Sequence, residues 1–360
     1  MTEILQQDLS AQLQDRTEQS LADKQPLVIR GGGSKDFLGR EPLGEPLELA
    51  GHSGIINYEP TELVVTVRGG TTLSALEQSL ADNGQMLSFE PPDFAGRATI
   101  GGSVACNLSG PARPYAGAAR DALLGITLLN GKGEILHFGG EVMKNVAGYD
   151  LSRLMAGAMG TLGVLLEVSL KVLPSPDREI TLVREGIAIE QAFHQLSGLG
   201  RKPLPISGAA FYQDRLSIRL AGNEAGLAAA KTIIPGDELE SQDADEYWRS
   251  IKDQTHDFFR SEKPLWRLSV PANCPELPIG GECLYDWGGA QRWVLSDEPA
   301  DKLFRLAEEA GGHATAFRRP CDGEAVFQPL PPGLHTLHQR LKQAFDPEGI
   351  LNPGRLYPGV

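Results

Sequence analysis

The 360-residue sequence contains no run of about 18 apolar residues, the length that a helix needs to cross a bilayer. The best candidate, "LGVLLEVSLKVL" at 162–173, is interrupted by Glu167 and Lys171 and is better interpreted as a strand pair or one long strand. The N-terminus, "MTEILQQDLSAQLQDRTEQS", is polar and acidic, unlike a signal peptide. We therefore expect no transmembrane segment and a cytoplasmic protein, with any contact to the inner membrane made through partners.

Basic residues are scarce. The chain has 33 Lys and Arg against 47 Asp and Glu, which gives a net charge of −14. Nucleic-acid binding needs a basic face, and docking on anionic lipid needs a polybasic patch, so neither is expected. A small anionic ligand remains compatible with this charge if local Arg side chains or backbone N–H groups hold it.

Cysteine and histidine do not occur in metal-binding patterns. The four cysteines, Cys106, Cys274, Cys283 and Cys321, include no C-x-x-C pair, so no iron–sulfur cluster is expected in this chain. The seven His show no zinc-type spacing, and we expect no metal. Cys274 and Cys283 are close enough in sequence to pair, but free thiols are the expectation in the cytoplasm.

The apolar pattern predicts both strands and helices. Strands are expected at 27–29, 62–67 and 162–173, with a hairpin in which "LLGITLL" and "EILHF" flank "NGKG". Helices are expected at 4–21, from Thr71 or Thr72 to Gly84, at "YDLSRLMAGAMG", and at "GLHTLHQRLKQAFDP" with Leu334, Leu337, Leu341 and Phe345 on one face. After residue 177, strands such as "RLSIRL" and "RWVLS" alternate with helical segments.

Glycine is abundant, and the stretch "PLVIRGGGSKDFLG" at 26–39 places three glycines directly after a strand. A turn explains such a cluster without a ligand, because glycine tolerates positive φ. Successive backbone N–H groups can instead form a concave anion site. A G-x-G-x-x-G motif would need Gly at 36, where Asp36 stands, and no P-loop string occurs. A phosphate loop here would belong to another architecture.

Four glycine clusters follow one another along the chain: Gly31-Gly32-Gly33, Gly101-Gly102 through Gly110, Gly157-x-x-Gly160-x-x-Gly163, and Pro353-Gly354. With the segments "IRGGGSK", "TIGGSVACNLSG", "AARDALLGITLLNGKGEI", "KNVAGYDLSRLMAGAMGTLGVLLEVSLKVLP" and "FDPEGILNPGR", they resemble the FAD-binding domain of the vanillyl-alcohol oxidase / p-cresol methylhydroxylase family. "GYDLSRLMAGAMGTLG" and "LYDWGGAQRWV" are most similar to the FAD-binding subunits of bacterial glycolate oxidases.

The resemblance implies an α+β fold with a two-lobed FAD-binding domain and an α+β cap. The expected ranges are 1–175 for the FAD-binding domain, 176–325 for the cap, and 326–360 for a C-terminal helix and tail that pack on the FAD domain. The "PSPD" segment at 174–177 and the fall in glycine content after it support the first boundary.

The resemblance also implies which residues hold FAD. N–H groups of Gly31, Gly32, Gly33 and Ser34 are expected at the pyrophosphate, with Arg30 and Lys35 as the nearest cations, either of which can instead point to solvent. Thr99, Ile100, Gly101, Gly102 and Ser103 match the second cofactor segment. Asn107 and Gly110 match its continuation near the isoalloxazine ring, Gly163 and Val164 the adenine side, and Asn352 and Arg355 the tail that returns to the flavin.

Covalent members of the family attach FAD through a His beside the glycine loop. Ser34 stands in that neighbourhood and the nearest His is His52, so FAD is expected to be non-covalent. Cys106 is expected to be a small buried thiol rather than a linkage. Gly157 and Gly160 are expected to be helix-packing glycines, and Asp150 to cap the helix that begins at Leu151.

The catalytic residues are less well defined. Related 2-hydroxy-acid dehydrogenases carry a G-H-x-G-D-G-N-x-H string in the cap, whereas the corresponding "LYDWGGAQRWV" has no His. Arg318, Arg319 and Arg355 are candidates for holding a substrate carboxylate, although a solvated Arg318–Arg319 pair is an equal alternative. His335 and His338 are expected to be surface or structural residues.

The resemblance implies a flavin-dependent oxidation of glycolate or a related 2-hydroxy acid to a 2-oxo acid. Electrons would pass to partners, namely a related FAD-containing catalytic subunit and an iron–sulfur subunit. Two alternatives stay open. In the first, the chain would bind FAD only as an electron relay or as a structural subunit. In the second, it would be a stand-alone FAD-dependent sugar or lactone oxidase.

Overall fold

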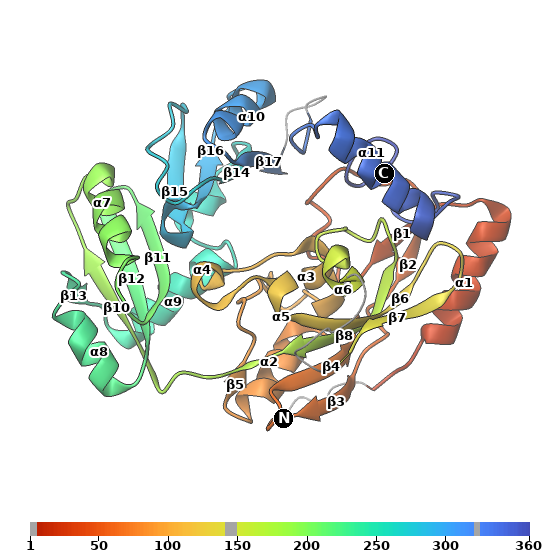
Figure 1. The fold of residues 1–360 in the computed structure, drawn as a ribbon, viewed down its shortest axis with the longest axis horizontal. Coiled ribbons are helices and arrows are strands. Elements are labelled where there is room, and N and C mark those ends of the chain that lie inside the picture. Colours follow the sequence, from red (N-terminus) through yellow and green to blue (C-terminus); the bar gives the residue numbers. More distant parts are fainter. Residues whose placement is uncertain (1–5, 141–149, 320–324) are drawn as a thin grey trace. The chain divides into compact units, whose positions relative to one another are not determined.

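The computed structural model describes residues 6–140, 150–319 and 325–360, and divides the chain into two compact units. Unit 1 comprises Met1–Ser109, Ala118–Ser175 and Leu330–Val360, and unit 2 comprises Gly110–Gly117 and Pro176–Pro329. Both units combine strands and helices, as expected for an α+β chain (Figure 1). None of the helices in the described ranges is long and apolar enough to cross a membrane.

A five-stranded antiparallel sheet forms the centre of unit 1. Its order is β3 (Ile55–Glu59), β4 (Val64–Arg68), β8 (Val164–Lys171), β6 (Leu123–Leu129) and β7 (Ile135–Gly139). The predicted hairpin around "NGKG" is confirmed as β6 and β7. The predicted strand at 162–173 is confirmed as β8, which pairs with both β4 and β6 and is mostly buried.

Helices cover this sheet through apolar residues at helical spacing. Thr72 caps α2 (Leu73–Ala81), and its Oγ1 accepts the Ala75 N–H at 3.4 Å. The predicted start of this helix is therefore confirmed. Leu73, Leu76 and Leu80 are fully buried in one core. The same core receives α3 (Ile100–Cys106), α5 (Ala119–Ala122) and α6 (Leu151–Met155).

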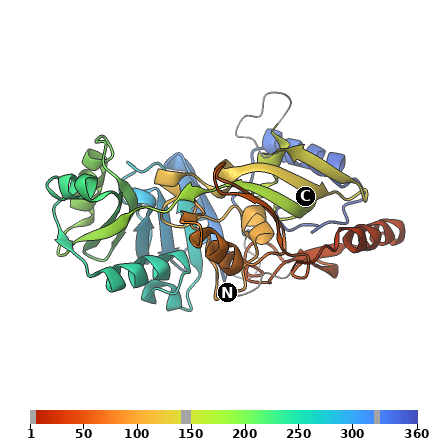
Figure 2. The ribbon, with the colours of Figure 1, turned by 90° about the horizontal axis from the view of Figure 1, so that it is seen from below.

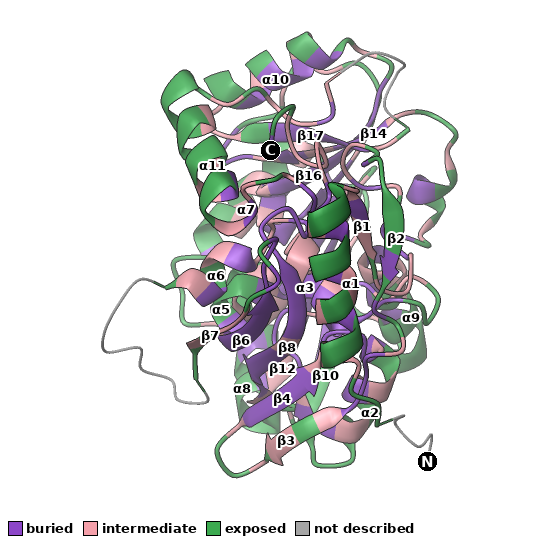
Figure 3. Cartoon of the chain, turned by 90° about the vertical axis from the view of Figure 1, so that its right-hand side faces the viewer, coloured by how far each residue is buried: buried purple, intermediate pink, exposed green. Residues whose placement is uncertain are grey.

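A second, smaller layer joins the strand after α1 to the C-terminal tail. In it, β1 (Leu27–Arg30) pairs in parallel with β2 (Glu45–Glu48). The helix α1 (Ser10–Asp23) packs on the same core through Leu13, and its exposed face is turned toward the viewer in Figure 3. Leu351 of the C-terminal tail forms a parallel bridge with Leu27 in the same core. A short pair, β5 (Gln85–Met86) and β9 (Leu173–Pro174), completes the unit.

Two expectations about helices change in the structure. Asp150 caps α6 as predicted, since its Oδ1 accepts the Arg153 N–H at 3.1 Å. However, α6 ends at Met155, so Gly157 and Gly160 lie in a loop with φ of 91° and 74°. Interpreting them as helix-packing glycines was wrong, because their left-handed backbone conformation ends a helix instead of continuing it.

The C-terminal helix α11 (Pro332–Phe345) is present, but its apolar face is only partly used. Leu341 and Phe345 pack against the core, whereas Leu334 and Leu337 are 49% and 50% exposed. The one buried side chain of α11 is Lys342. Figure 2 shows the helix in blue beside the strands of unit 1.

Unit 2 is built on an eight-stranded antiparallel sheet. Its order is β13 (Asp237–Glu238), β10 (Arg178–Arg184), β12 (Arg215–Gly222), β11 (Ile206–Tyr212), β15 (Glu282–Asp286), β16 (Gln291–Leu295), β14 (Leu265–Ser269) and β17 (His313–Arg318). Its α-helices in the described ranges are α4 (Arg113–Ala116), α7 (Ile189–Leu199), α8 (Glu224–Lys231), α9 (Ser241–Lys252) and α10 (Ala300–Glu309), and it has two short 3₁₀ helices, η1 (Asp257–Arg260) and η2 (Trp287–Gly289).

The cysteines of unit 2 are not paired where the structure describes them. Cys274 and Cys283 are free thiols, and Cys321 lies outside the described residues.

Replacing Leu76 by Ala should lower the free energy of unfolding by about 2–5 kcal/mol, because the fully buried side chain leaves a cavity between α2 and the sheet. Leu43→Ala is the matched control, since Leu43 is 79% exposed, and a change within about 0.5 kcal/mol is expected. Urea unfolding followed by circular dichroism measures both values. Equal effects of the two substitutions would contradict the assigned core.

Candidate cofactor-binding site

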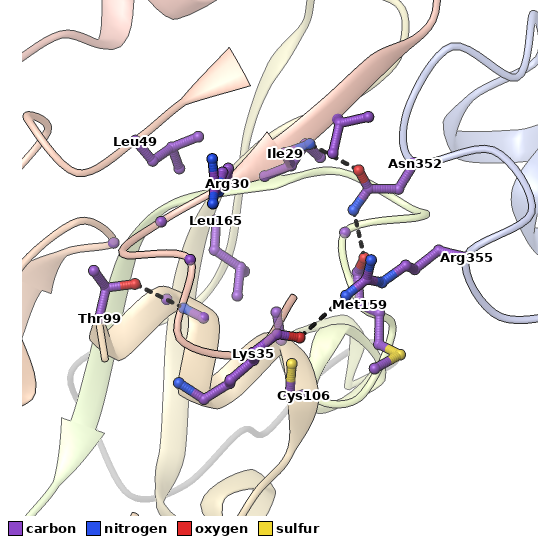
Figure 4. Close-up of a pocket in the computed structure, with 18 of the residues that line it drawn as sticks. Ile29, Arg30, Lys35, Leu49, Thr99, Cys106, Met159, Leu165, Asn352 and Arg355 are labelled. Carbon is purple, nitrogen blue, oxygen red and sulfur yellow. Dashed lines mark hydrogen bonds between the residues drawn. The ribbon is translucent and has the colours of Figure 1, made fainter. Parts of the chain in front are cut away.

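A cavity opens in unit 1 where β1 ends (Figure 4). Including its open mouth, it holds about 920 Å³ of empty space. Most of its lining comes from four parts of the sequence: the end of β1 with the loop to Asp36, the α3 region from Thr99 to Cys106, the segment from Met155 to Leu165, and the C-terminal tail; Pro42, Leu49 and Gly69 add to it. Each of the four parts contains or adjoins one of the glycine clusters, so the structure brings these parts of the chain to one place.

The triple-glycine loop lies directly on the segment that precedes α3. A Cβ atom added to Gly31 would stand 2.4 Å from Thr99 Oγ1, and one added to Gly32 would stand 1.7 Å from the Arg97 carbonyl oxygen. Real Cβ atoms do not approach other atoms so closely, and the carbonyl oxygen belongs to the backbone. Gly33 has φ of +66°. Only glycine fits these positions without moving the backbone.

The N–H groups of this loop are free to donate. Within the described residues, the backbone N–H groups of Gly31, Gly32 and Gly33 have no hydrogen-bond acceptor. By contrast, the Gly101 N–H donates to the Gly69 carbonyl at 2.9 Å, and the Gly102 N–H donates to Thr99 Oγ1 at 3.3 Å. The first cluster therefore has N–H donors left for a ligand, whereas those of Gly101 and Gly102 are used within the chain.

The two cations next to the loop differ in their surroundings. Lys35 is 7% exposed and its Nζ donates to Ser34 Oγ at 3.2 Å. It forms no direct ion pair with a described carboxylate, although the charge of Asp93 acts on it. Burial lowers the pKa of the Lys35 ammonium. Arg30 is instead exposed, and its Nη2 lies 2.6 Å from Asp36 Oδ2. Lys35 is therefore the cation whose charge is left for a ligand.

Arg355 reaches the cavity from the tail. Its Nη2 donates to the Lys35 carbonyl at 3.2 Å, which fixes the loop to the tail (Figure 4). Burial lowers the pKa of the guanidinium, and the nearby Cys106 and Asp36 oppose this shift. Cys106, expected to be buried, is half-buried and lines the cavity.

Asn352 connects two walls of the cavity. Its side-chain Oδ1 accepts the Ile29 N–H at 2.7 Å, and its Nδ2 donates to the Met159 carbonyl at 2.7 Å. Ile29 belongs to β1 and Met159 to the loop after α6, and both residues line the cavity. Because the protein already uses both polar atoms of this amide, the structure gives Asn352 a positioning role at the cavity edge.

Five of the predicted binding residues do not line the cavity. Ile100, Ser103 and Val164 are fully buried beneath it. Asn107 ends α3 with φ of 49°, and its Oδ1 accepts the Arg120 N–H at 3.3 Å. Gly110 belongs to unit 2, where its carbonyl accepts the Trp287 Nε1–H at 2.9 Å.

Two of the three predicted catalytic arginines also lie outside the cavity. Arg318 and Arg319 are in unit 2, and only Arg355 is in the lining. Arg318 donates to Gln254 Oε1 at 2.5 Å, and burial beside Arg319 lowers its pKa to about 10. Arg319 binds the Ser261 carbonyl and Glu262. Their own chain therefore engages both guanidinium groups.

Several lining residues were not among those predicted. Gly69 follows β4 as Gly31 follows β1, and this repeated strand–glycine pattern is a signal in the sequence. A Cβ on Gly160 would lie 2.6 Å from Asn352 Nδ2, a contact that sequence spacing does not reveal. The apolar walls, which include Leu49, Met155 and Leu165, carry no distinguishing pattern.

His52, the histidine nearest to the loop in sequence, does not line the cavity. Its Nδ1 accepts the Leu9 N–H at 3.0 Å, and its Nε2 lies 3.0 Å from the Leu166 carbonyl oxygen. Burial lowers the pKa of the imidazole. Both ring nitrogens are thus engaged elsewhere. The described residues contain no cluster of three or more His, Cys, Asp or Glu suited to a metal ion.

Unpaired N–H groups, a buried ammonium and apolar walls together suit a long ligand with a phosphate group and an aromatic part. Residues 7–139 match the model "FAD binding domain", and residues 328–356 match "FAD linked oxidases, C-terminal domain". These two matches contain the glycine loop and the returning tail.

Comparisons of the whole chain agree with these matches. The chain is 47% identical over 350 residues to glycolate oxidase subunit GlcE of Escherichia coli K12, covering 97% of this chain and 98% of that protein. It is 36% identical over 141 residues to a D-lactate dehydrogenase of Anaerostipes hadrus, covering 39% and 29% of the two chains. The structure of p-cresol methylhydroxylase with substrate bound has a TM-score of 0.71 at 15% identity, covering 96% and 87% of the two chains.

Replacing Asn352 by Asp should lower the free energy of unfolding of the ligand-free protein by about 1–3 kcal/mol at pH 7. The substitution places a buried carboxylate oxygen against the Met159 carbonyl, where Nδ2 now donates. Asn83→Asp is the control, because Asn83 makes a similar amide-to-carbonyl bond at an exposed site. Unfolding curves that respond equally to both substitutions would refute the bridging role.

Proposed function

Since the chain belongs to the FAD-linked oxidase family of the p-cresol methylhydroxylase type, we propose that it is the FAD-binding subunit of a glycolate oxidase complex. The complex oxidises glycolate or related 2-hydroxy acids to 2-oxo acids. The observation that carries this proposal is the cavity of unit 1, in which the family's glycine loop presents unpaired N–H groups beside a buried lysine.

The residues present fit FAD. The N–H groups of Gly31, Gly32 and Gly33 would hold the pyrophosphate, each contributing about 1.5–3 kcal/mol as a hydrogen bond to a charged group. Lys35 would balance part of the negative charge from within the cavity, where low solvent exposure strengthens the attraction. Bound FAD would supply the acceptor for the hydride that leaves the α-carbon of the hydroxy acid.

The chain's own residues would position the cofactor and exclude water from the cavity. Leu49, Met155 and Leu165 form apolar walls that suit the aromatic parts of the cofactor. Asn352 and Arg355 hold the tail against the loop and thereby close one side of the cavity. Because neither His52 ring nitrogen is free and this His lies outside the cavity, we propose that FAD is held without a covalent bond.

Partners complete this proposal. The two glycolate oxidase relatives are both described as subunits, GlcE of Escherichia coli K12 and GlcD of Bacillus subtilis, which supports a heteromeric complex. We propose a related FAD-containing catalytic subunit and an iron–sulfur subunit as partners, and a cytoplasmic location. Electrons from the flavin would leave this chain through the partners.

A relay role is the second candidate, and the placement of Arg318 and Arg319 favours it. Both guanidinium groups are bound by their own chain, and neither lines the described cavity. The cap also lacks the His-rich string of the related dehydrogenases. In this version the chain holds FAD for electron transfer, and a sister subunit oxidises the substrate.

An anaerobic titration tests both candidates. The purified chain is saturated with FAD, its visible spectrum is recorded, and glycolate is added. Bleaching of the flavin band is expected if the chain itself oxidises the hydroxy acid. A bound flavin that bleaches only after the partner subunits are added would establish the relay. A chain that takes up no FAD would overturn the proposed function.

Acid precipitation tests whether FAD is bound without a covalent bond. It should release all flavin into the supernatant, and flavin that stays with the precipitated protein would contradict this.

Lys35→Met should weaken FAD binding about 10- to 100-fold, because one charged donor is worth about 1.4–2.8 kcal/mol here. The double variant R30Q/D36N removes the neighbouring exposed ion pair without changing the net charge, and its affinity should stay within about threefold of wild type. Quenching of flavin fluorescence during titration gives both dissociation constants. A larger loss in the double variant than in Lys35→Met would reverse the assigned roles.

A further inference from the structure

The buried lysine of α11 has no obvious reason to be buried on that helix. Lys342 is 7% exposed, while the other side chains of α11 are half-buried or exposed. Its Nζ donates to the carbonyls of Thr161 at 2.8 Å and Leu351 at 2.7 Å, and lies 2.7 Å from Asp346 Oδ2. These three acceptors satisfy all three N–H groups of the ammonium.

Asp346 extends this cluster into the tail. The carboxylate is 1% exposed, with Oδ1 accepting the Ile350 N–H at 3.0 Å and Oδ2 accepting the Leu351 N–H at 2.8 Å. The turn after α11 is thereby closed onto the helix. A Cβ on Gly131 would lie 2.2 Å from Asp346 Oδ1, so the loop between β6 and β7 packs tightly over the carboxylate.

The segment held in this way is the one that borders β1. The Leu27 N–H donates to the Ile350 carbonyl at 2.7 Å, and the Asn352 N–H donates to the Leu27 carbonyl at 2.9 Å. The Asn352 side chain then binds Ile29, two residues before the triple glycine. The tail is therefore hydrogen-bonded alongside β1, from its first residue, Leu27, to Ile29.

The same segment also holds the opposite wall. Lys342 binds the Thr161 carbonyl, and Asn352 binds the Met159 carbonyl, on either side of Gly160. Gly160 lines the cavity, as do Ile29 and Met159, whereas Lys342 and Asp346 do not. Two bridges thus join the loop after α6 to the tail, and the tail joins that loop to β1.

We propose that the buried Lys342–Asp346 pair is a positioning device that fixes the distance between the triple-glycine loop and the loop around Gly160, and so sets the affinity for FAD without touching it. This inference rests on the proposed function. Breaking the pair leaves one charge buried without its partner, so the segment must shift to rehydrate it. The shift would be passed to β1 and to Gly160 through Leu351 and Asn352.

Asp346→Asn is the primary test, because it keeps the shape of the side chain while removing its charge. Lys342→Met is the second variant, and Arg340→Met is the matched control, since Arg340 is an exposed cation on the same helix. FAD is titrated into each variant at a temperature at which circular dichroism shows that variant to be folded. Asp346→Asn and Lys342→Met should each weaken FAD binding at least 10-fold, and Arg340→Met should leave it within twofold.

Two further readouts separate positioning from general stability. The double variant K342M/N352A should lose little more FAD affinity than the single variant that has the larger loss, because both substitutions act through the same tail segment. In the FAD-free protein, amide exchange of residues 27–33 should be faster in Asp346→Asn than in Arg340→Met. If Lys342→Met does not fold, Asp346→Asn decides the question alone.

Folded Asp346→Asn protein with wild-type FAD affinity and unchanged exchange at 27–33 would overturn the inference. Failure of the proposed function is recognised separately, because the wild-type chain itself would then take up no FAD. The exchange measurement needs no cofactor, so it tests the positioning role even in that case.

Discussion

Direct contact between two backbone segments is the constraint on which the cavity depends. The triple-glycine loop rests on the carbonyl of Arg97 and the side chain of Thr99, so close that no Cβ fits at Gly31 or Gly32. The three glycines line the cavity, and their N–H groups have no acceptor in the described chain. A turn chosen only for flexibility would not need this contact, which favours the anion site over a simple turn.

The tail explains why residues far apart in the sequence belong to one site. β1 begins at Leu27 and the tail passes it at Leu351, and hydrogen bonds in both directions make them neighbouring strands. The family models match 7–139 and 328–356, the two parts that this contact joins. The cap residues lie between them in sequence, so unit 1 closes only when the last residues return to it.

An acidic chain can hold an acidic cofactor because local electrostatics decide binding, not net charge. The net charge is −14, yet the cavity carries a buried ammonium and neutral N–H donors. Arg30 adds little to the local field because Asp36 compensates it in solvent. Lys35 forms no direct ion pair with a described carboxylate, Asp93 acts on it only through its charge, and low exposure keeps the field of Lys35 from being screened by water.

Local patterns in the sequence predicted β4, β8 and the β6–β7 hairpin of the central sheet, the Thr72 and Asp150 caps, and the glycine loop that lines the cavity, because hydrophobic period, caps and backbone freedom act over a few residues. They did not predict the edge strand β3. The family resemblance added two predictions: that the cofactor is FAD, and that the C-terminal tail returns to it. Only the tertiary structure decided that Arg30 forms a direct ion pair while Lys35 does not, and that Asn352 joins two walls. It also decided that Arg318 and Arg319 are bound in unit 2 and that Gly110 belongs to the same unit. Those outcomes depend on which groups meet across long sequence separations, and a side chain's partner, unlike its helix or strand, is set by distance in space.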